Sequence, residues 1–277
     1  MDDAPEPFKI SQWRIFASLL PGLLLASIFM LAVDPIPQPE SYHLFADKRI
    51  VLQVPHAGDV LSNLALIIVG AWGLWFLSYS QLHVRAFIDG RERRNFWWLF
   101  SGVFLTGFGS GWYHLGPDNY SLVWDRLPMT MAFMGMLAVM ITERVGLSFG
   151  TALLKPLLFV GVASVLWWIW TEYDGHGDLR LYLIVQFYPM VTMLLMLLFL
   201  PACYSHGEYY WGVLVFYVIA KVVEILDHQI FEFTQNVISG HSLKHLFAAL
   251  AVALLLRMLY VRKKRIGILS YGKLTQY

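Results

Sequence analysis

Long apolar segments recur along the whole chain and are separated by short polar connections. A helix of about 20 apolar residues matches the ~30 Å hydrocarbon core of a lipid bilayer. Segments of this length predict eight transmembrane helices, at 13–33, 59–79, 96–116, 120–142, 152–171, 181–201, 209–231 and 240–261. The longest connection, 34–58, contains PIPQPE, which predicts an extended or looped segment. The predicted fold is therefore an all-α, polytopic membrane helix bundle without a soluble domain.

Composition supports the membrane class. Hydrophobic residues make up 58% of the chain and charged residues 14%, whereas about a quarter of the residues of a soluble domain are charged. The acidic first residues, MDDAPEPFK, precede an apolar segment longer than that of a signal peptide, so we expect a retained helix. The single cysteine, Cys203, excludes an internal disulfide and a zinc site built from several cysteines of one chain. No phosphate-binding glycine loop, nucleophile elbow or nucleic-acid-binding patch is evident.

The distribution of Lys and Arg predicts the orientation of these helices, because cytoplasmic loops are enriched in both. Eight spans place both termini on one side, together with most basic residues: Lys9, Arg14, Arg85, Arg91, Arg93, Arg94, Arg144, Lys155, Arg262, Lys263, Lys264, Arg265 and Lys273. The loops of the other side hold only Lys48, Arg49 and Arg180, with Arg126 and Lys244 just inside helix ends. We therefore expect both termini in the cytoplasm.

Ionisable residues inside the predicted spans share one depth near the outer face. His114 ends the third span, Asp125 lies about one turn into the fourth, and His241 and His245 open the last. Asp227 and His228 lie about one turn from the outer end of the seventh span. Ionisable groups inside a membrane are costly and usually functional, so this shared depth indicates a common site.

Three histidines and a carboxylate at one level suggest a metal site. Imidazole suits Zn²⁺, and three His ligands, here His114, His241 and His245, leave a fourth position open for water. Bound zinc lowers the pKa of water towards ~7, which generates a nucleophile. Asp125 is then a candidate general base. Ser110, one helical turn from His114, is a candidate hydrogen-bond donor to a water molecule or an oxyanion.

Each of these residues also has a purely structural interpretation. An HxxxH pair can be structural, Asp125 can pair with Arg126, and Ser110 can serve close helix packing. Lys221 and Glu224 are expected to neutralise each other. The alternative is that Glu224, Asp227 and His228 form a proton path or a second shell around the zinc ligands. We expect Ser62 and Asn63 to cap or bridge helices, and His43, His56 and His176 to be solvated in outer loops.

Three motifs give the chain a resemblance to a known family. GFGSGWYH, WDRLPM about ten residues later and GHSLKH at the start of the last helix resemble the alkaline ceramidase family. This family belongs to a superfamily of seven-helix membrane hydrolases that includes the adiponectin receptors. The segment YHLFADKRIVLQVPHAGDVLSNLALIIVGAWGL resembles the stretch that leads into the first core helix of bacterial members. The likeness covers roughly 42–261, so the chain divides into an N-terminal segment with an additional helix (1–41), a seven-helix core (42–261) and a basic tail (262–277).

The resemblance implies a zinc-dependent amidase that cleaves the N-acyl bond of ceramide, a lipid taken from the bilayer, to give a sphingoid base and a fatty acid. It implies His114, His241 and His245 as zinc ligands and Ser110 and Asp125 as catalytic residues. The location it implies is a bacterial inner membrane with the zinc site near the outer face. Eukaryotic members hold calcium in an acid-rich segment; the corresponding loop offers Glu40, Asp47 and Asp59 without a clear match, which leaves calcium unsupported.

Other functions remain open at this stage. A zinc-containing receptor or lipid sensor with little turnover fits the same histidines, although a structural zinc site would more naturally have a fourth protein ligand. A haem-binding electron carrier would need two histidines facing each other across the bundle. A proton-coupled transporter would use Lys221, Glu224 and Asp227.

Overall fold

The computed structural model describes residues 12–79 and 82–265, and helices dominate them. These residues form no β-strand, only two isolated β-bridges, which confirms the all-α prediction. The elements are α1 (Gln12–Ala32), η1 (Glu40–His43), α2 (Ala57–Ser62), α3 (Leu64–Tyr79), α4 (Leu82–Ala86), α5 (Glu92–Leu115), α6 (Asn119–Arg144), α7 (Leu147–Tyr173), α8 (Arg180–Phe199), α9 (Tyr209–Ile225), α10 (Asp227–Phe233) and α11 (Gly240–Val261).

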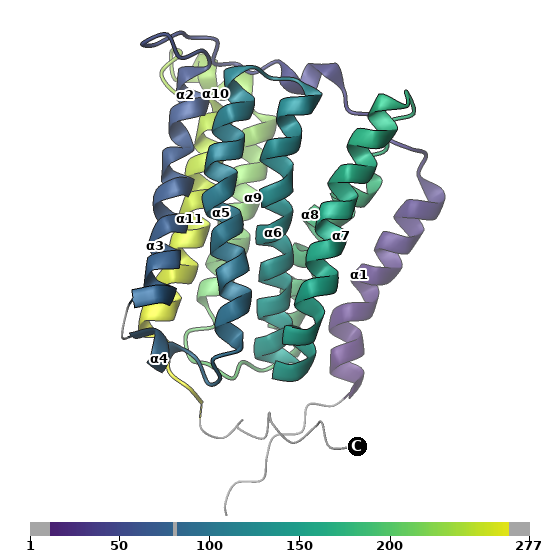
Figure 1. Ribbon diagram of the computed structural model, residues 1–277, viewed down its shortest axis with the longest axis vertical. Coiled ribbons are helices and arrows are strands. Elements are labelled where there is room, and N and C mark those ends of the chain that lie inside the picture. Colours follow the sequence, from purple (N-terminus) through teal and green to yellow (C-terminus); the bar gives the residue numbers. More distant parts are fainter. Residues whose placement is uncertain (1–11, 80–81, 266–277) are drawn as a thin grey trace, which may run out of the picture.

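The long helices run side by side along the long axis of the molecule (Figure 1). α5 packs between α3 and α6, α11 packs against α9 and α3, and α6 also contacts α7 and α8. α1 lies at the edge of the bundle against α8. The first described turn of α1 and the last turn of α11 lie at the same end of the bundle (Figure 1). The bundle thus has a lower end that carries both of these helix termini, and an upper end.

Six helical segments are long and apolar enough to cross a membrane within the described residues: 12–32, 57–79, 119–144, 147–173, 180–199 and 240–261. A seventh is added if the bent pair α9 and α10 forms one span. α5, the remaining predicted span, carries Glu92, Arg93 and Arg94 in its first turn and is not among them. The structure is thus that of a multi-pass membrane protein, and the number of eight spans stays a prediction.

Two predicted spans are interrupted at the upper end. The helix that begins at Ala57 is broken at Asn63, between α2 and α3. The segment 209–231, predicted as one helix, ends at Ile225, and α10 then leaves at 80° to α9. Asp227 and His228 therefore do not lie on the seventh span but at the start of a short separate helix. Irregular backbone at membrane depth is tolerated only where protein or water satisfies its polar groups, so these breaks must have polar partners.

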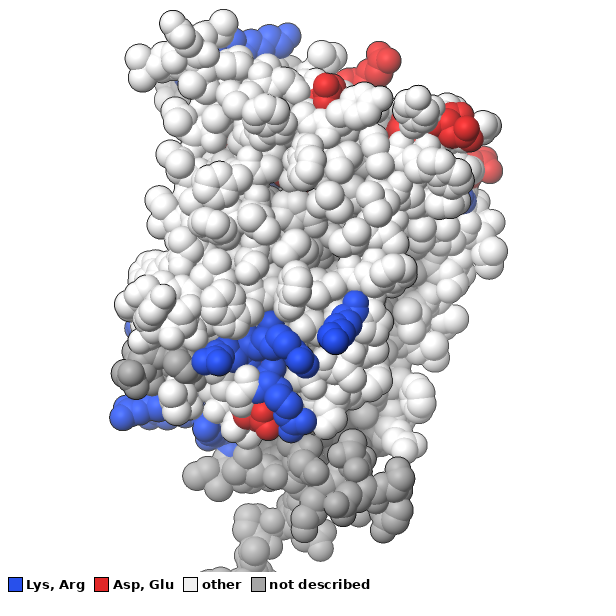
Figure 2. All heavy atoms as spheres, viewed as in Figure 1, with Lys and Arg blue, Asp and Glu red and all other residues white. Residues whose placement is uncertain are grey.

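Charged side chains on the visible face separate into two groups (Figure 2). Most Lys and Arg gather towards the lower end, most acidic residues lie at the upper end together with one basic group, and a broad band between the two ends carries almost no charge. Arg262, which the sequence assigned to the basic tail, does not belong to this exposed basic group. Its guanidinium is fully buried, forms an ion pair with Glu143 and donates to the Ala86 carbonyl at 2.6 Å. Lys9 and Lys273 lie outside the described residues.

Candidate metal centre

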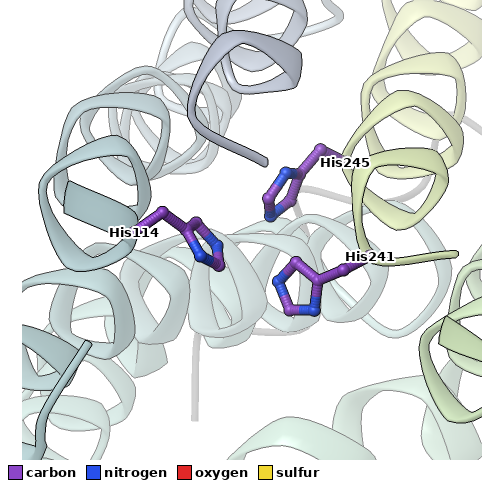
Figure 3. A group of neighbouring side chains, drawn as sticks. All are labelled: His114, His241 and His245. Atoms are coloured by element: carbon purple, nitrogen blue, oxygen red, sulfur yellow. The ribbon is translucent and has the colours of Figure 1, made fainter. Parts of the chain in front are cut away.

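Three buried histidines meet at the upper end of the bundle. His114 comes from the last turn of α5, and His241 and His245 come from the first turns of α11 (Figure 3). One potential ligand atom of each ring lies within 4.8 Å of the corresponding atoms of the other two. The ring centroids are 4.7 Å, 4.9 Å and 5.3 Å apart. This group can hold a metal ion, and it is the only such His, Cys, Asp or Glu group found among residues 12–79 and 82–265.

The unsatisfied nitrogens of these rings support ion binding. Both ring nitrogens of His114 and Nε2 of His241 are buried and have no hydrogen-bond partner in the described part of the chain. Buried polar atoms in native proteins are nearly always paired, and each unpaired one needs an explanation. Imidazole nitrogens are good ligands for Zn²⁺. The donor set therefore fits zinc, and a bound ion would satisfy one nitrogen of His114 and one of His241.

Ser62 orients the third ring. Its hydroxyl donates to the Asp59 carbonyl at 3.0 Å, so its oxygen can accept a hydrogen bond from Nδ1–H of His245 at 2.8 Å. This hydrogen-bond network assigns the proton of His245 to Nδ1 and leaves the lone pair of Nε2 directed at the metal site. Such outer partners fix the tautomer and the orientation of metal-binding histidines. Ser62 thus bridges α2 and α11, as predicted, and it does so through a candidate ligand.

The first turn of α11 is held by two buried aspartates. Asp227 accepts hydrogen bonds from the backbone N–H of His241 at 2.7 Å and from that of Ala46 at 2.9 Å. Asp59 accepts from the hydroxyls of Ser239 and Ser242 at 2.6 Å and 2.7 Å. The free N–H groups of a helix N-terminus require such acceptors. Asp227 therefore positions the backbone of a candidate ligand and does not contact its ring.

The loop between α1 and α2 covers the three histidines. Phe45 is 4% exposed, and its ring centroid lies 4.5 Å from those of both His114 and His241. His43 in the same loop contacts the Tyr113 hydroxyl at 2.8 Å. An aromatic side chain at this place excludes water from one side of the site and adds edge-to-face contacts to the two imidazoles. The sequence alone gave no signal for this contact.

Ser110 and Asp125 lie next to the histidines on the side of a cavity in the bundle, whereas Phe45 does not line this cavity. The Ser110 hydroxyl is 3.4 Å from Nε2 of His245, and Ser110 and Asp125 line the same cavity. Ser110 is 1% exposed and Asp125 is 6% exposed. α5 and α6 approach each other closely at this level, because a Cβ at Gly109 would overlap the Trp124 carbonyl. The structure therefore places the five residues singled out by the sequence motifs in one cluster.

A cavity of about 350 Å³ extends from this cluster into the bundle. Ser110, Asp125 and His245 line its upper end, and Met136 and Leu255 line its far end. From His245 to Leu255 the lining follows α11 for about 15 Å, at 1.5 Å per residue. Its walls are mostly apolar, as is common for small-molecule sites that have a few polar groups at one end. The shape and lining suit an amphiphile with its polar part next to the histidines.

Glu224 is neutralised within this upper end of the cavity. Its carboxylate pairs with Lys221 at 2.7 Å, as predicted from their spacing, and also with Lys244 of α11 at 3.1 Å. His228 is exposed and contacts the Leu44 carbonyl at 3.0 Å. The three residues considered for a proton path, Glu224, Asp227 and His228, therefore have separate partners rather than one continuous chain of contacts.

Other polar residues singled out in the sequence lie elsewhere. His56 contacts the Asp47 carbonyl at 2.6 Å, and the exposed His176 contacts the Asp174 carbonyl at 2.9 Å. In the segment compared with a calcium-binding one, Asp47 is fully buried and forms an ion pair with Arg49 at 2.8 Å. Hydrogen bonds from Arg49 and Gly58 outweigh the effect of burial and lower the pKa of Asp47. Asp47 thus stabilises the loop.

Comparison with models of known protein families and with curated protein sequences gives no match. The fold and the site define an all-helical chain with helices suited to crossing a membrane and with a buried group of three histidines that can bind a metal ion.

Proposed function

We propose that this protein is a zinc-dependent intramembrane hydrolase of the alkaline ceramidase type. It cleaves the N-acyl amide bond of ceramide or a related lipid amide and releases the amine and a fatty acid. The observation that carries the proposal is the position of His114, His241 and His245, whose metal site borders an amphiphile-sized cavity at the point where Ser110 and Asp125 lie. A site that is only structural has no need of these two groups or of the cavity.

Zinc held by the three histidines would lower the pKa of a water molecule and polarise the amide carbonyl. Asp125 accepts the proton of the attacking water and delivers it to the nitrogen of the departing amine. The Ser110 hydroxyl donates a hydrogen bond to the oxygen on which negative charge develops. Ser62 holds the ring of His245, and Asp227 holds the backbone of His241, so that the ligands keep their orientation during the reaction.

The cavity and the surface charge support a substrate drawn from the membrane. Lining residues from Leu99 to Leu255 provide apolar walls for an acyl chain, while the polar groups are confined to the upper end. The basic lower end in Figure 2 favours an orientation with the termini in the cytoplasm and the metal site near the outer face. For a bacterial protein this membrane is the inner membrane.

Release of fatty acid by the purified protein tests the proposal. Wild type is compared with Asp125→Asn and Ser110→Ala on a panel of ceramides and other lipid amides, and metal content is measured for wild type and His241→Ala. We expect zinc near one equivalent in wild type, loss of zinc in His241→Ala, and loss of most turnover in Asp125→Asn with zinc retained. Asp174→Asn, an exposed aspartate in the α7–α8 loop, serves as the matched control.

Two results would contradict the proposal. Zinc-loaded wild type that releases no more fatty acid than Asp125→Asn across the panel would favour a receptor or lipid sensor. Purified protein with a haem absorption band and no zinc would favour an electron carrier.

A further inference from the structure

Arg126 occupies an unusual position beside the candidate catalytic residues. Its side chain lines the same cavity as Asp125 and is 5% exposed. The guanidinium stacks over the rings of Trp168 and Tyr182, at 4.1 Å and 4.6 Å from their centroids. One nitrogen, Nη2, donates to Oε1 of Gln38 at 2.6 Å. The aromatic rings and a neutral amide therefore form its immediate surroundings.

The charge of Arg126 lacks an ion-pair partner in the described part of the chain. No carboxylate of residues 12–79 and 82–265 forms a salt bridge with it, and its Nη1 is buried without a hydrogen bond. Asp125 is its neighbour in sequence, but its carboxylate forms no salt bridge with the guanidinium. Cation–π contacts offset part of the cost of burying a guanidinium, yet they satisfy none of its N–H donors. Buried arginines are nearly always paired.

The whole polar end of the cavity carries excess positive charge. Arg126, Lys221 and Lys244 provide three cations among the lining residues, and Asp125 and Glu224 provide two anions. Lys221 and Lys244 share the carboxylate of Glu224, whereas Arg126 is the one cation of the three that forms no ion pair with a carboxylate of the described residues. A divalent ion at the three histidines would increase this excess. A neutral ligand would leave the imbalance in place, whereas a ligand with one negative charge would remove part of it.

We propose that the cavity binds lipid amides whose polar head carries an anionic group, a carboxylate or a phosphate, and that the guanidinium of Arg126 binds this group. The inference rests on the proposed function only in taking a lipid amide as the ligand, and it narrows the substrate class. Guanidinium matches the geometry of carboxylate and phosphate oxygens and forms strong charge-assisted hydrogen bonds with them. Stacking on Trp168 and Tyr182 holds the group in place before the ligand arrives.

Equilibrium binding to the zinc-loaded protein in detergent tests this directly. Three ligands with one acyl chain are compared: N-acylethanolamine, which is neutral, its O-phosphate, and N-acylglycine. We expect at least one anionic ligand to bind about 10- to 100-fold more tightly than the neutral one, the range that charge-assisted hydrogen bonds provide. The phosphate and carboxylate arms then identify the preferred anion. Equal affinity for all three ligands in wild type overturns the inference without any variant.

Two variants locate the source of the preference. Arg126→Gln is expected to keep its affinity for the neutral ligand and to lose the preference for the anionic ones, and Arg126→Lys is expected to keep part of it. Arg180→Gln is the matched control, since Arg180 lies at the same end of the bundle, pairs with Asp178 and does not line the cavity. Thermal unfolding in the absence of ligand establishes that each variant is folded. An anion preference that persists in Arg126→Gln would place the anion on the metal or a lysine and overturn the inference.

Hydrolysis of the same ligands separates this inference from the proposed function. Turnover of the neutral and anionic amides with equal kcat/KM would leave the hydrolase proposal intact and refute the role of Arg126. Tight, Arg126-dependent binding of an anionic amide without release of fatty acid would refute hydrolysis and keep the anion-binding site.

Discussion

The close approach of α5 to α6 at Gly109 gives a sharp test of how the site is held. A Cβ at this position would overlap the carbonyl oxygen of Trp124 and come within 3.2 Å of the backbone nitrogen of Asp125. Backbone atoms cannot move aside as the end of a flexible side chain can, so Gly109→Ala must push the two helices apart. Gly111, two residues further on, has no atom within 4 Å of a built Cβ. Gly111→Ala is therefore a control with the same chemical change in the same helix.

The two substitutions should change stability in opposite directions. Replacing a helical glycine by alanine stabilises by about 0.5–1 kcal/mol when space is available, which is the expectation for Gly111→Ala. Inserting a methyl group into a packed contact costs about 1–3 kcal/mol. The net expectation for Gly109→Ala is thus a loss of up to roughly 2.5 kcal/mol.

The effect on the metal site should exceed the effect on stability. Ser110 and His114 move with α5, whereas Asp125 stays on α6 and His241 and His245 stay on α11. We expect Gly109→Ala to lower zinc affinity about 10-fold or more, on the scale of other changes around metal ligands. Thermal unfolding and competition with a zinc chelator measure the two quantities. Equal melting temperatures and zinc affinities for the two variants would refute the argument that this contact positions the site.

Two further predictions concern the polar contacts around the site and in the outer loops. Ser62→Ala removes the hydrogen-bond acceptor that fixes the proton of His245 on Nδ1. We therefore expect about a 10- to 100-fold loss of zinc affinity, measured by competition with a chelator. Ser78→Ala, which changes an exposed serine on α3, is the control and should leave zinc affinity unchanged. The hydrogen bond from Arg180 lowers the pKa of Asp178 in the folded state. The pair therefore stabilises the fold fully at pH values above the pKa that Asp178 has in the unfolded chain. This stabilisation is lost as the pH falls through the lower pKa that Asp178 has in the folded protein. Thermal unfolding should therefore show a smaller acid-induced loss of stability in Asp178→Asn than in wild type; an equal or larger loss would contradict this.

The long helices and the meeting of the histidines could be predicted because both follow from local periodicity. The last helix occupies 240–261 in the structure, as its apolar pattern predicted. His241 and His245 lie one turn apart on that helix, and His114 ends another predicted span at the same depth, so a common location followed from bilayer geometry. Predicting that the three histidines share one depth does not require knowing which helices are neighbours in the bundle. Every contact that the sequence did not predict does require that knowledge.

Contacts made by loops and helix breaks could not be predicted, because they depend on tertiary packing. The apolar pattern continues through Leu226, where the chain bends by 80°, so nothing in the periodicity marks the start of α10. Phe45 lies in a polar connection and reaches the histidines only because the loop folds over the bundle. Arg262 begins the basic run RKKR, and its burial follows from the position of Glu143 on another helix. Residue type alone does not distinguish Arg262 from Lys263, which is exposed.

The helix breaks and the metal centre lie at one end of the bundle for a shared physical reason. Breaking α2–α3 and α9–α10 frees backbone groups that need polar partners within the protein. Asp59 lies in α2, four residues before the break at Asn63, and Asp227 begins α10. Both bind the first turn of α11, which carries two of the three histidines. The carboxylates next to the helix breaks therefore fix the backbone that carries two of the candidate ligands. A site held in this way is organised by the fold before the ion binds, which is the condition for a metal position that stays open to substrate.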